Sequence, residues 1–202
     1  MKQNLIDFQI YKRERSGVFM CKILKELQGL SASELLKKCD ITLEPPIDLN
    51  KILKKIGISA IATNFSEIEK ETTLEQGDIL GATVSNHDTL SIFFREDDTE
   101  NRLRFTIAHE LAHCCLHSLD LQESHVELRM NNSCKDDKER DADIFAGELL
   151  IPEDSLKKIY GKLFSPSLSA LAKIYEVSTN VMSARLDYLS LPYLKDIQYK
   201  NS

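Results

Sequence analysis

The segment from Arg104 to His113 carries the strongest chemical pattern in this 202-residue chain. It contains an H-E-x-x-H sequence, in which His109 and His113 are four positions apart and Glu110 follows the first histidine. On an α-helix this spacing places both imidazoles on one face, one turn apart, where they can share a metal ion. Glu110 lies about 100° round the helix from His109, close enough to act on a metal-bound water without being a ligand. The pattern predicts a hydrolytic metal site with Glu110 as the general base.

The remaining positions of that helix predict that its polar face lies in an enclosed site. On a helical wheel, Thr106 and His117 fall with the H-E-x-x-H residues in one sector of roughly 100°. Nearly all other positions are apolar or cysteine, among them Leu103, Ile107, Leu111, Cys114 and Cys115. Because buried polar groups need partners, we expect the polar sector to face a cleft.

A second acidic pattern lies downstream and predicts the third ligand. Glu139 and Asp143 are four residues apart and would share a helix face, beside small residues that allow another helix to approach closely. A catalytic zinc typically has three protein ligands and an open position, so Glu139 is predicted as the third ligand. Asp143 is predicted to accept a hydrogen bond from a ligand imidazole. Asp136 and Asp141 are the alternative third ligands. Two histidines and a carboxylate suit Zn2+ best, although Mn2+ or Fe2+ could occupy such a site.

The other histidines and the cysteines are interpreted as structural. His117 is expected to end the helix, where a positive charge is favoured, with a fourth ligand or a substrate contact as the alternative. His87 is expected to be a turn residue, with stabilisation of an oxyanion as the alternative. Cys114 and Cys115 fall on the apolar side and are expected in the core.

Hydrophobic periodicity and capping residues predict the elements that position these side chains. Residues 1–45 are predicted to be helical, with Ser31 and Glu34 as a capping box, and Pro45-Pro46 interrupts the chain. Asp48 is expected to cap a helix that ends at Gly57. We expect strands at 58–63, 81–84 and 90–94, with a turn at 85–88. A helix is predicted at 102–117, capped by Thr99 or Asn101, and a loop or weakly formed segment follows at 118–132. A capping box of Ser133 and Asp136 is expected to start the next helix, which ends near residue 150. Three short helices are predicted at 153–160, 168–175 and 179–189.

These elements predict an α+β fold: a small, mostly antiparallel sheet packed against helices. Residues 1–45 would form an N-terminal helical segment, residues 46–152 the metal-binding core, and residues 153–202 a C-terminal helical subdomain. The pair of short helices in the last segment is predicted to be helix-turn-helix-like, with Ser178 capping the second helix.

Composition predicts a soluble cytoplasmic protein. Hydrophobic residues make up 42% of the chain and charged residues 29%, which is ordinary for a globular domain. The sequence has no apolar run of the roughly 18–20 residues that span a bilayer, and its first residues do not resemble a signal peptide. The five cysteines are an odd number and are expected to be reduced thiols.

The two motifs resemble those of the ImmA/IrrE family of metallopeptidases. The likeness is carried by Arg104–His117 (RFTIAHELAHCCLH) and Glu139–Pro152 (ERDADIFAGELLIP), and it extends weakly over Pro46–Asn64 and the C-terminal helices. The resemblance implies a zincin-like, gluzincin-type endopeptidase with Glu139 as third ligand and Asp143 beside it. It also implies limited cleavage of a transcriptional repressor that controls a mobile element or a stress response. Ala112 stands where the family often has glycine and Asp143 where it often has asparagine, and neither change removes a ligand.

Protein rather than nucleic acid is the expected partner. The net charge is −6, and Lys173 and Arg185 of the C-terminal helices are balanced by Glu176 and Asp187, so few cations are left for a phosphate backbone. We expect the protein substrate to add to an edge of the sheet through backbone hydrogen bonds. The alternatives are a non-catalytic metal-binding regulator that binds a repressor or DNA through its C-terminal helices, and a toxin-like module whose Met1–Asp40 helices dock a partner. The sequence leaves the oligomeric state open.

Overall fold

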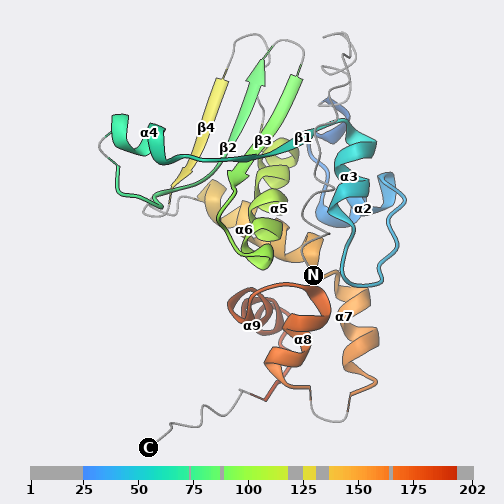
Figure 1. Cartoon of the computed structure of the whole chain (residues 1–202). Coiled ribbons are helices and arrows are strands. Elements are labelled where there is room, and N and C mark those ends of the chain that lie inside the picture. Colours follow the sequence, from blue (N-terminus) through green and yellow to red (C-terminus); the bar gives the residue numbers. More distant parts are fainter. Residues whose placement is uncertain are drawn as a thin grey trace, which may run out of the picture.

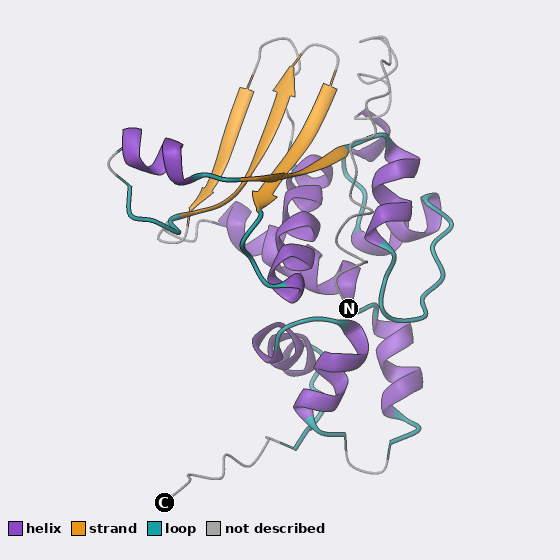
Figure 2. Cartoon of the chain, in the orientation of Figure 1, coloured by secondary structure: helices purple, strands orange, loops and turns teal. Residues whose placement is uncertain are grey.

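The computed structural model describes residues 25–72, 74–86, 89–117, 125–130, 137–163 and 166–194. The structure combines helices with one mainly antiparallel sheet, as in an α+β fold (Figures 1 and 2). The elements are α2 (Ala32–Lys38), α3 (Leu49–Ile56), β1 (Ser59–Thr63), α4 (Ser66–Glu71), β2 (Ile79–Asn86), β3 (Thr89–Arg95), α5 (Glu100–Leu116), β4 (His125–Met130), α6 (Asp137–Leu150), α7 (Glu153–Tyr160), α8 (Leu168–Tyr175) and α9 (Thr179–Tyr188).

The helix boundaries follow local capping chemistry. Ser31 caps α2 by accepting from the Glu34 N–H, while the Glu34 carboxylate accepts from the Ser31 N–H at 2.8 Å, so the predicted capping box is confirmed. Asp48 caps α3, which ends at Gly57 in the left-handed conformation (φ 74°). The predicted capping of the helix that ends at Leu150 by Ser133 and Asp136 lies outside the described residues, as does all of the predicted helical region before residue 25.

The sheet has four strands in the order β1-β3-β2-β4. β1 runs parallel to β3, whereas the β2–β3 and β2–β4 pairs are antiparallel, so the predicted mostly antiparallel sheet is confirmed. The predicted turn between β2 and β3 includes His87, which lies outside the described residues. The prediction of a loop over 118–132 is wrong for His125–Met130, which forms β4. Its six residues alternate polar and apolar side chains, which is a strand pattern, but the segment is short and follows a polar stretch. In the structure it is held by backbone pairing to β2.

Helix α5 lies against the sheet, and α6 runs beside α5 (Figure 1). α5 is preceded by Thr99 as its N-cap and is followed by His117, in agreement with the predicted limits. Gly81 allows the close approach of β2, because a Cβ built at this position would lie 2.7 Å from Thr106 Cγ2 of α5. The apolar side of α5 packs into the main core, where Cys114 and Cys115 are buried free thiols, as expected.

One large apolar core extends from Leu27 to Leu186 and includes residues of all three predicted segments. A smaller cluster of Phe65, Ile79 and Ala82 lies under α4, a helix that was not predicted. In the lower part of Figure 1, α7, α8 and α9 form a helical layer beneath α5 and α6. Ser167 caps α8 and Ser178 caps α9, as the C-terminal prediction requires for the second helix. None of the described helices is long and apolar enough to cross a membrane.

Candidate metal centre

Helices α5 and α6 bring three potential metal ligands together. His109 and His113 are buried on one face of α5, and their Nε2 atoms are 3.0 Å apart. Glu139 reaches them from the first turn of α6. Its Oε2 lies 3.2 Å from His109 Nε2, and its Oε1 lies 3.2 Å from His113 Nε2. The predicted ligand atoms therefore form a small triangle of acceptors between the two helices.

This triangle fits a zinc ion. Zinc binds histidine nitrogen and carboxylate oxygen at about 2.0–2.2 Å, and in a tetrahedral site such ligand atoms lie roughly 3.3 Å apart. The separations of 3.0 and 3.2 Å are close to this value, with each ring facing a different oxygen of the Glu139 carboxylate. Among the described residues, His109, His113 and Glu139 form the group that could hold a metal. The alternative ligand Asp141 is exposed and outside this group, and Asp136 lies outside the described residues.

Asp143 lies on the opposite side of the His109 ring from the triangle. Its Oδ1 is 3.0 Å from His109 Nδ1, and an N–H donated there leaves Nε2 unprotonated and directed at the metal position. Arg129 of β4 lies 3.4 Å from the same carboxylate oxygen and 5.4 Å from the centre of the Phe105 ring. Arg129 was missed from the sequence, because it falls in the segment that was predicted as a loop.

Glu110 is buried, with 1% of its surface exposed, and is held by the sheet. Thr83 of β2 donates a hydrogen bond from Oγ1 to Glu110 Oε2. A Cβ at Gly81 would come within 3.5 Å of Glu110 Oε1, so the glycine leaves room for the carboxylate. No sequence signal identified Thr83, because the strand register that aims it at α5 depends on tertiary packing. His117 ends α5 with its ring centre 5.1 Å from that of His113, and it lies outside the metal-binding group.

The ionisation of His113 and Glu139 suits a cation, whereas that of His109 competes with one. Burial and the neighbouring His109 ring lower the pKa of His113 to about 4, so this ring is neutral at pH 7. Burial alone would lower the pKa of His109, but hydrogen bonds to Asp143 and Glu139 outweigh it and raise this pKa. A metal ion must therefore displace the Nε2 proton that the metal-free ring donates to Glu139. The hydrogen bond from His109 lowers the pKa of Glu139, which keeps its carboxylate ionised. The arrangement can hold a divalent cation beside a buried carboxylate base.

Comparison with known families gives one match. The family model of the IrrE N-terminal-like domain matches residues 56–187, which include the sheet, α5, α6 and the C-terminal helices through most of α9. No curated protein and no solved structure shows a significant match to the chain.

Proposed function

The chain belongs to the IrrE N-terminal-like family of peptidases, and from this membership and the geometry of its site we propose that it is a zinc-dependent endopeptidase that makes limited cuts in a protein substrate. The observation that carries the proposal is the convergence of His109, His113 and Glu139 with the buried carboxylate of Glu110 on the same helix. A ligand set of two histidines and one carboxylate leaves a position open for substrate or water.

In the proposed mechanism Glu110 is the general base. A zinc ion bound by His109, His113 and Glu139 would polarise the carbonyl of the scissile bond and make water more acidic. Glu110 takes a proton from the attacking water and delivers it to the leaving amine. The Thr83 hydroxyl fixes the orientation of the Glu110 carboxylate, and Asp143 fixes that of the His109 ring.

We further propose that the substrate chain adds to β4. In the described part of the sheet β4 pairs with β2 alone, so its other edge can accept an extended peptide. Edge addition recognises backbone and tolerates many side chains, so selection of the cut site must come from pockets beside the strand. A transcriptional repressor of a mobile element or stress response, acting in the cytoplasm, is the substrate that the family resemblance suggests.

The burial of Arg185 argues against the DNA-binding alternative. This residue was one of two cations expected in the helix pair, yet it is 6% exposed and donates to Ile151 O and Glu148. A guanidinium that is buried and paired inside the protein cannot contact a phosphate backbone. We therefore assign the C-terminal helices to packing and substrate docking.

The first test is elemental analysis of the purified protein. Wild type should bind about one zinc per chain, and His113→Ala and Glu139→Ala should lose most of it, whereas Asp141→Ala should keep it. A wild type that cannot be loaded with zinc would exclude the proposal. Loss of zinc in Asp141→Ala but not in Glu139→Ala would move the third ligand to Asp141.

The second test compares wild type with Glu110→Gln in cells. New protein N-termini that arise with wild type and not with Glu110→Gln identify substrates, and a DNA-binding repressor among them would support the substrate class. The variant should keep its zinc and lose cleavage by at least about 100-fold. Equal cleavage by the two proteins would contradict the role of Glu110.

A further inference from the structure

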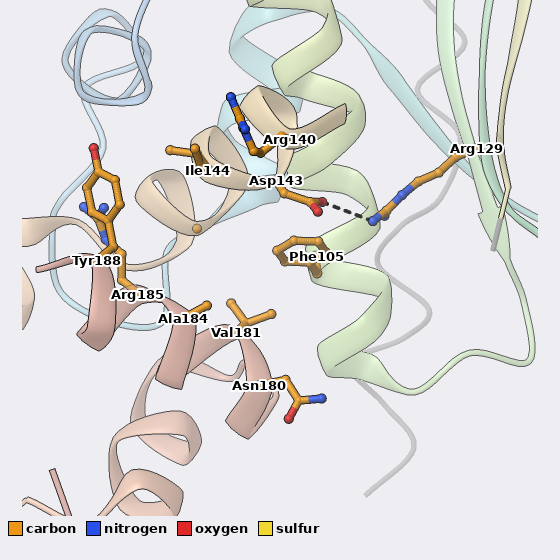
Figure 3. A pocket seen from close by; sticks show the side chains of 11 residues that line it. Phe105, Arg129, Arg140, Asp143, Ile144, Asn180, Val181, Ala184, Arg185 and Tyr188 are labelled. Atoms are coloured by element: carbon orange, nitrogen blue, oxygen red, sulfur yellow. Dashed lines mark hydrogen bonds and ion pairs between the residues drawn. The ribbon is translucent and has the colours of Figure 1, made fainter. Parts of the chain in front are cut away.

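A cavity of about 390 Å³ opens beside the metal centre, between α5, α6 and α9 (Figure 3). It borders the site through Asp143, which lines the cavity and contacts His109, and through Arg129, which is paired with Asp143. Phe105, one turn before His109 on α5, lines the cavity too, and its ring centre is 6.3 Å from that of His109. The cavity therefore lies next to the metal ligand His109, within reach of a side chain close to the metal.

The surface of the cavity is mainly hydrocarbon. In Figure 3 Ile144 of α6 faces Val181 and Ala184 of α9 across the opening, with Tyr188 at one end and Phe105 at the other. Ile144 and Tyr188 remain 38% and 61% exposed at its rim. Exposed apolar side chains round an apolar hollow are typical of a ligand site rather than of a solvated surface.

The polar groups of the cavity interact with one another. Arg129 is paired with Asp143, Arg140 with Asp137, and Arg185 with Glu148 and Ile151 O. These pairings argue against a dedicated anion site. Asp143, the carboxylate that lines the cavity, is already paired with Arg129, so a lysine or arginine side chain would lose hydration there without gaining a counter-ion.

We propose that this cavity is the specificity pocket of the peptidase and that it accepts a large apolar side chain of the substrate, next to the bond that is cut. This inference rests on the proposed function. The volume is at the lower end of the roughly 300–1,000 Å³ of small-molecule sites. It corresponds to roughly a dozen water-sized groups, which is ample for an isobutyl or benzyl side chain.

Gly147 gives a direct way to fill the pocket. It lines the cavity from α6, and a Cβ built on it would meet no atom within 4 Å. A larger side chain at this position therefore enters open space, and replacing a helical glycine does not weaken the helix. Ala184→Leu fills the pocket independently from α9. Ala170→Leu places the same side chain on an exposed position of α8 outside the cavity and is the matched control.

The test uses acetyl-amino-acid hydroxamates, which are anchored to zinc by the hydroxamate group. Their side chains are methyl, isobutyl, benzyl or aminobutyl, and binding to the zinc-loaded protein is measured by calorimetry, with acetohydroxamate as the reference. Isobutyl and benzyl should bind at least about tenfold more tightly than methyl. Aminobutyl should bind no more tightly than methyl. Gly147→Leu and Ala184→Leu should abolish the gain without changing zinc content or acetohydroxamate affinity, and Ala170→Leu should keep it.

The outcomes separate this inference from the proposed function. If acetohydroxamate binds but the four side chains give equal affinities, the pocket assignment is wrong and the metal site stands. If both pocket-filling variants still bind the isobutyl and benzyl hydroxamates more tightly than the methyl one, as wild type does, these side chains bind elsewhere. The pocket assignment is then equally wrong. If acetohydroxamate itself does not bind the zinc-loaded protein, the open metal position fails, and both proposals fail with it.

Discussion

Glu110 lies on α5, but the group that orients it comes from the sheet. The hydroxyl of Thr83 on β2 donates to Glu110 Oε2, and both residues are buried. A general base must point at the proton that it abstracts, so the loss of an orienting bond should lower the rate more than it lowers binding.

Replacing Thr83 with valine should test this role, because valine keeps the shape and removes the donor. We expect Thr83→Val to bind zinc as wild type does and to cleave roughly tenfold more slowly, mainly through kcat. Thr83→Ser restores a hydroxyl and should recover most of the rate. A loss of zinc in Thr83→Val, or no recovery in Thr83→Ser, would show that the residue supports the fold rather than the base.

At the scale of single residues, the sequence predicted the site residues whose relative positions follow from the periodicity of a helix. His109 and His113 share a face because they are four apart, and the same spacing aligned Glu139 with Asp143. Thr83 and Arg129 could not be predicted, because they reach the site from strands whose register depends on tertiary pairing. The spacing of residues within one segment does not determine which residue of a strand faces a helix.

At the scale of elements, the contact between β2 and α5 depends on Gly81. A methyl group here would lie 2.7 Å from Thr106 Cγ2 and 3.2 Å from the Phe93 carbonyl oxygen. We expect Gly81→Ala to lower the free energy of unfolding by about 1–3 kcal/mol, because the strand and helix must separate. Gly147→Ala is the control, since its methyl group enters open space and should leave stability equal or slightly higher. Equal unfolding midpoints in denaturant for the two variants would contradict a close contact at Gly81.

Helix α4 is joined to the sheet by a buried ion pair. Glu69 Oε1 accepts from Arg95 Nη1 at 2.6 Å and from the N–H groups of Gly77 and Ile79. Burial alone would raise the pKa of Glu69, but the hydrogen bonds from Ile79, Gly77 and Arg95 outweigh it and lower this pKa. Stability from Glu69 is therefore present above its unfolded pKa of about 4.3 and is lost as pH falls through the lower folded pKa.

Glu69→Gln should reveal this dependence. At pH 7 we expect the variant to lose about 2 kcal/mol of unfolding free energy, because Arg95 and two N–H groups lose a charged acceptor. The difference from wild type should shrink as pH falls below about 4.3, because the unfolded chain then takes up a proton at Glu69 before the folded protein does. Glu71→Gln changes an exposed carboxylate of the same helix and should have little effect. Urea unfolding at pH 7 and pH 3.5 measures both; a difference between Glu69→Gln and wild type that is unchanged at pH 3.5 would contradict the assignment.

Sequence predicted most helices, because their ends carry local signals such as Ser31, Asp48 and Ser178. It missed α4 and β4 for related reasons. α4 is short and charged on nearly every residue, and it is fixed by the buried Glu69. β4 is fixed by pairing with β2. Both elements are stabilised by partners far along the chain. β4 also carries the polar–apolar alternation of a strand, but over six residues only, which is a weak local signal.

At the scale of the whole molecule, the C-terminal helices share the core of the metal-binding part. Met182 and Leu186 of α9 belong to the same buried cluster as Leu111 of α5 and Leu149 of α6. Polar contacts add to this packing. Asn101 at the start of α5 donates to Val177 O, and Arg104 Nη1 lies 3.8 Å from Oε2 of Glu176, which follows α8. The apolar pocket lies at this junction, so its shape depends on α9 remaining docked.

Arg185 is the side chain that should report this coupling most clearly. Its Nε donates to Ile151 O at 3.1 Å, and its Nη1 lies 3.2 Å from Glu148, so one buried guanidinium joins α9 to the end of α6. Arg185→Met keeps the apolar stem but leaves a buried carbonyl and a carboxylate without this donor, which should lower the unfolding free energy by about 2–3 kcal/mol. Because one core includes α6 and α9, unfolding should remain a single transition in which far-ultraviolet circular dichroism and zinc release coincide. Lys173→Met removes an exposed cation of α8 and should change little. Separate transitions in Arg185→Met, with zinc retained after part of the helical signal is lost, would show instead that the C-terminal helices fold independently of the metal centre.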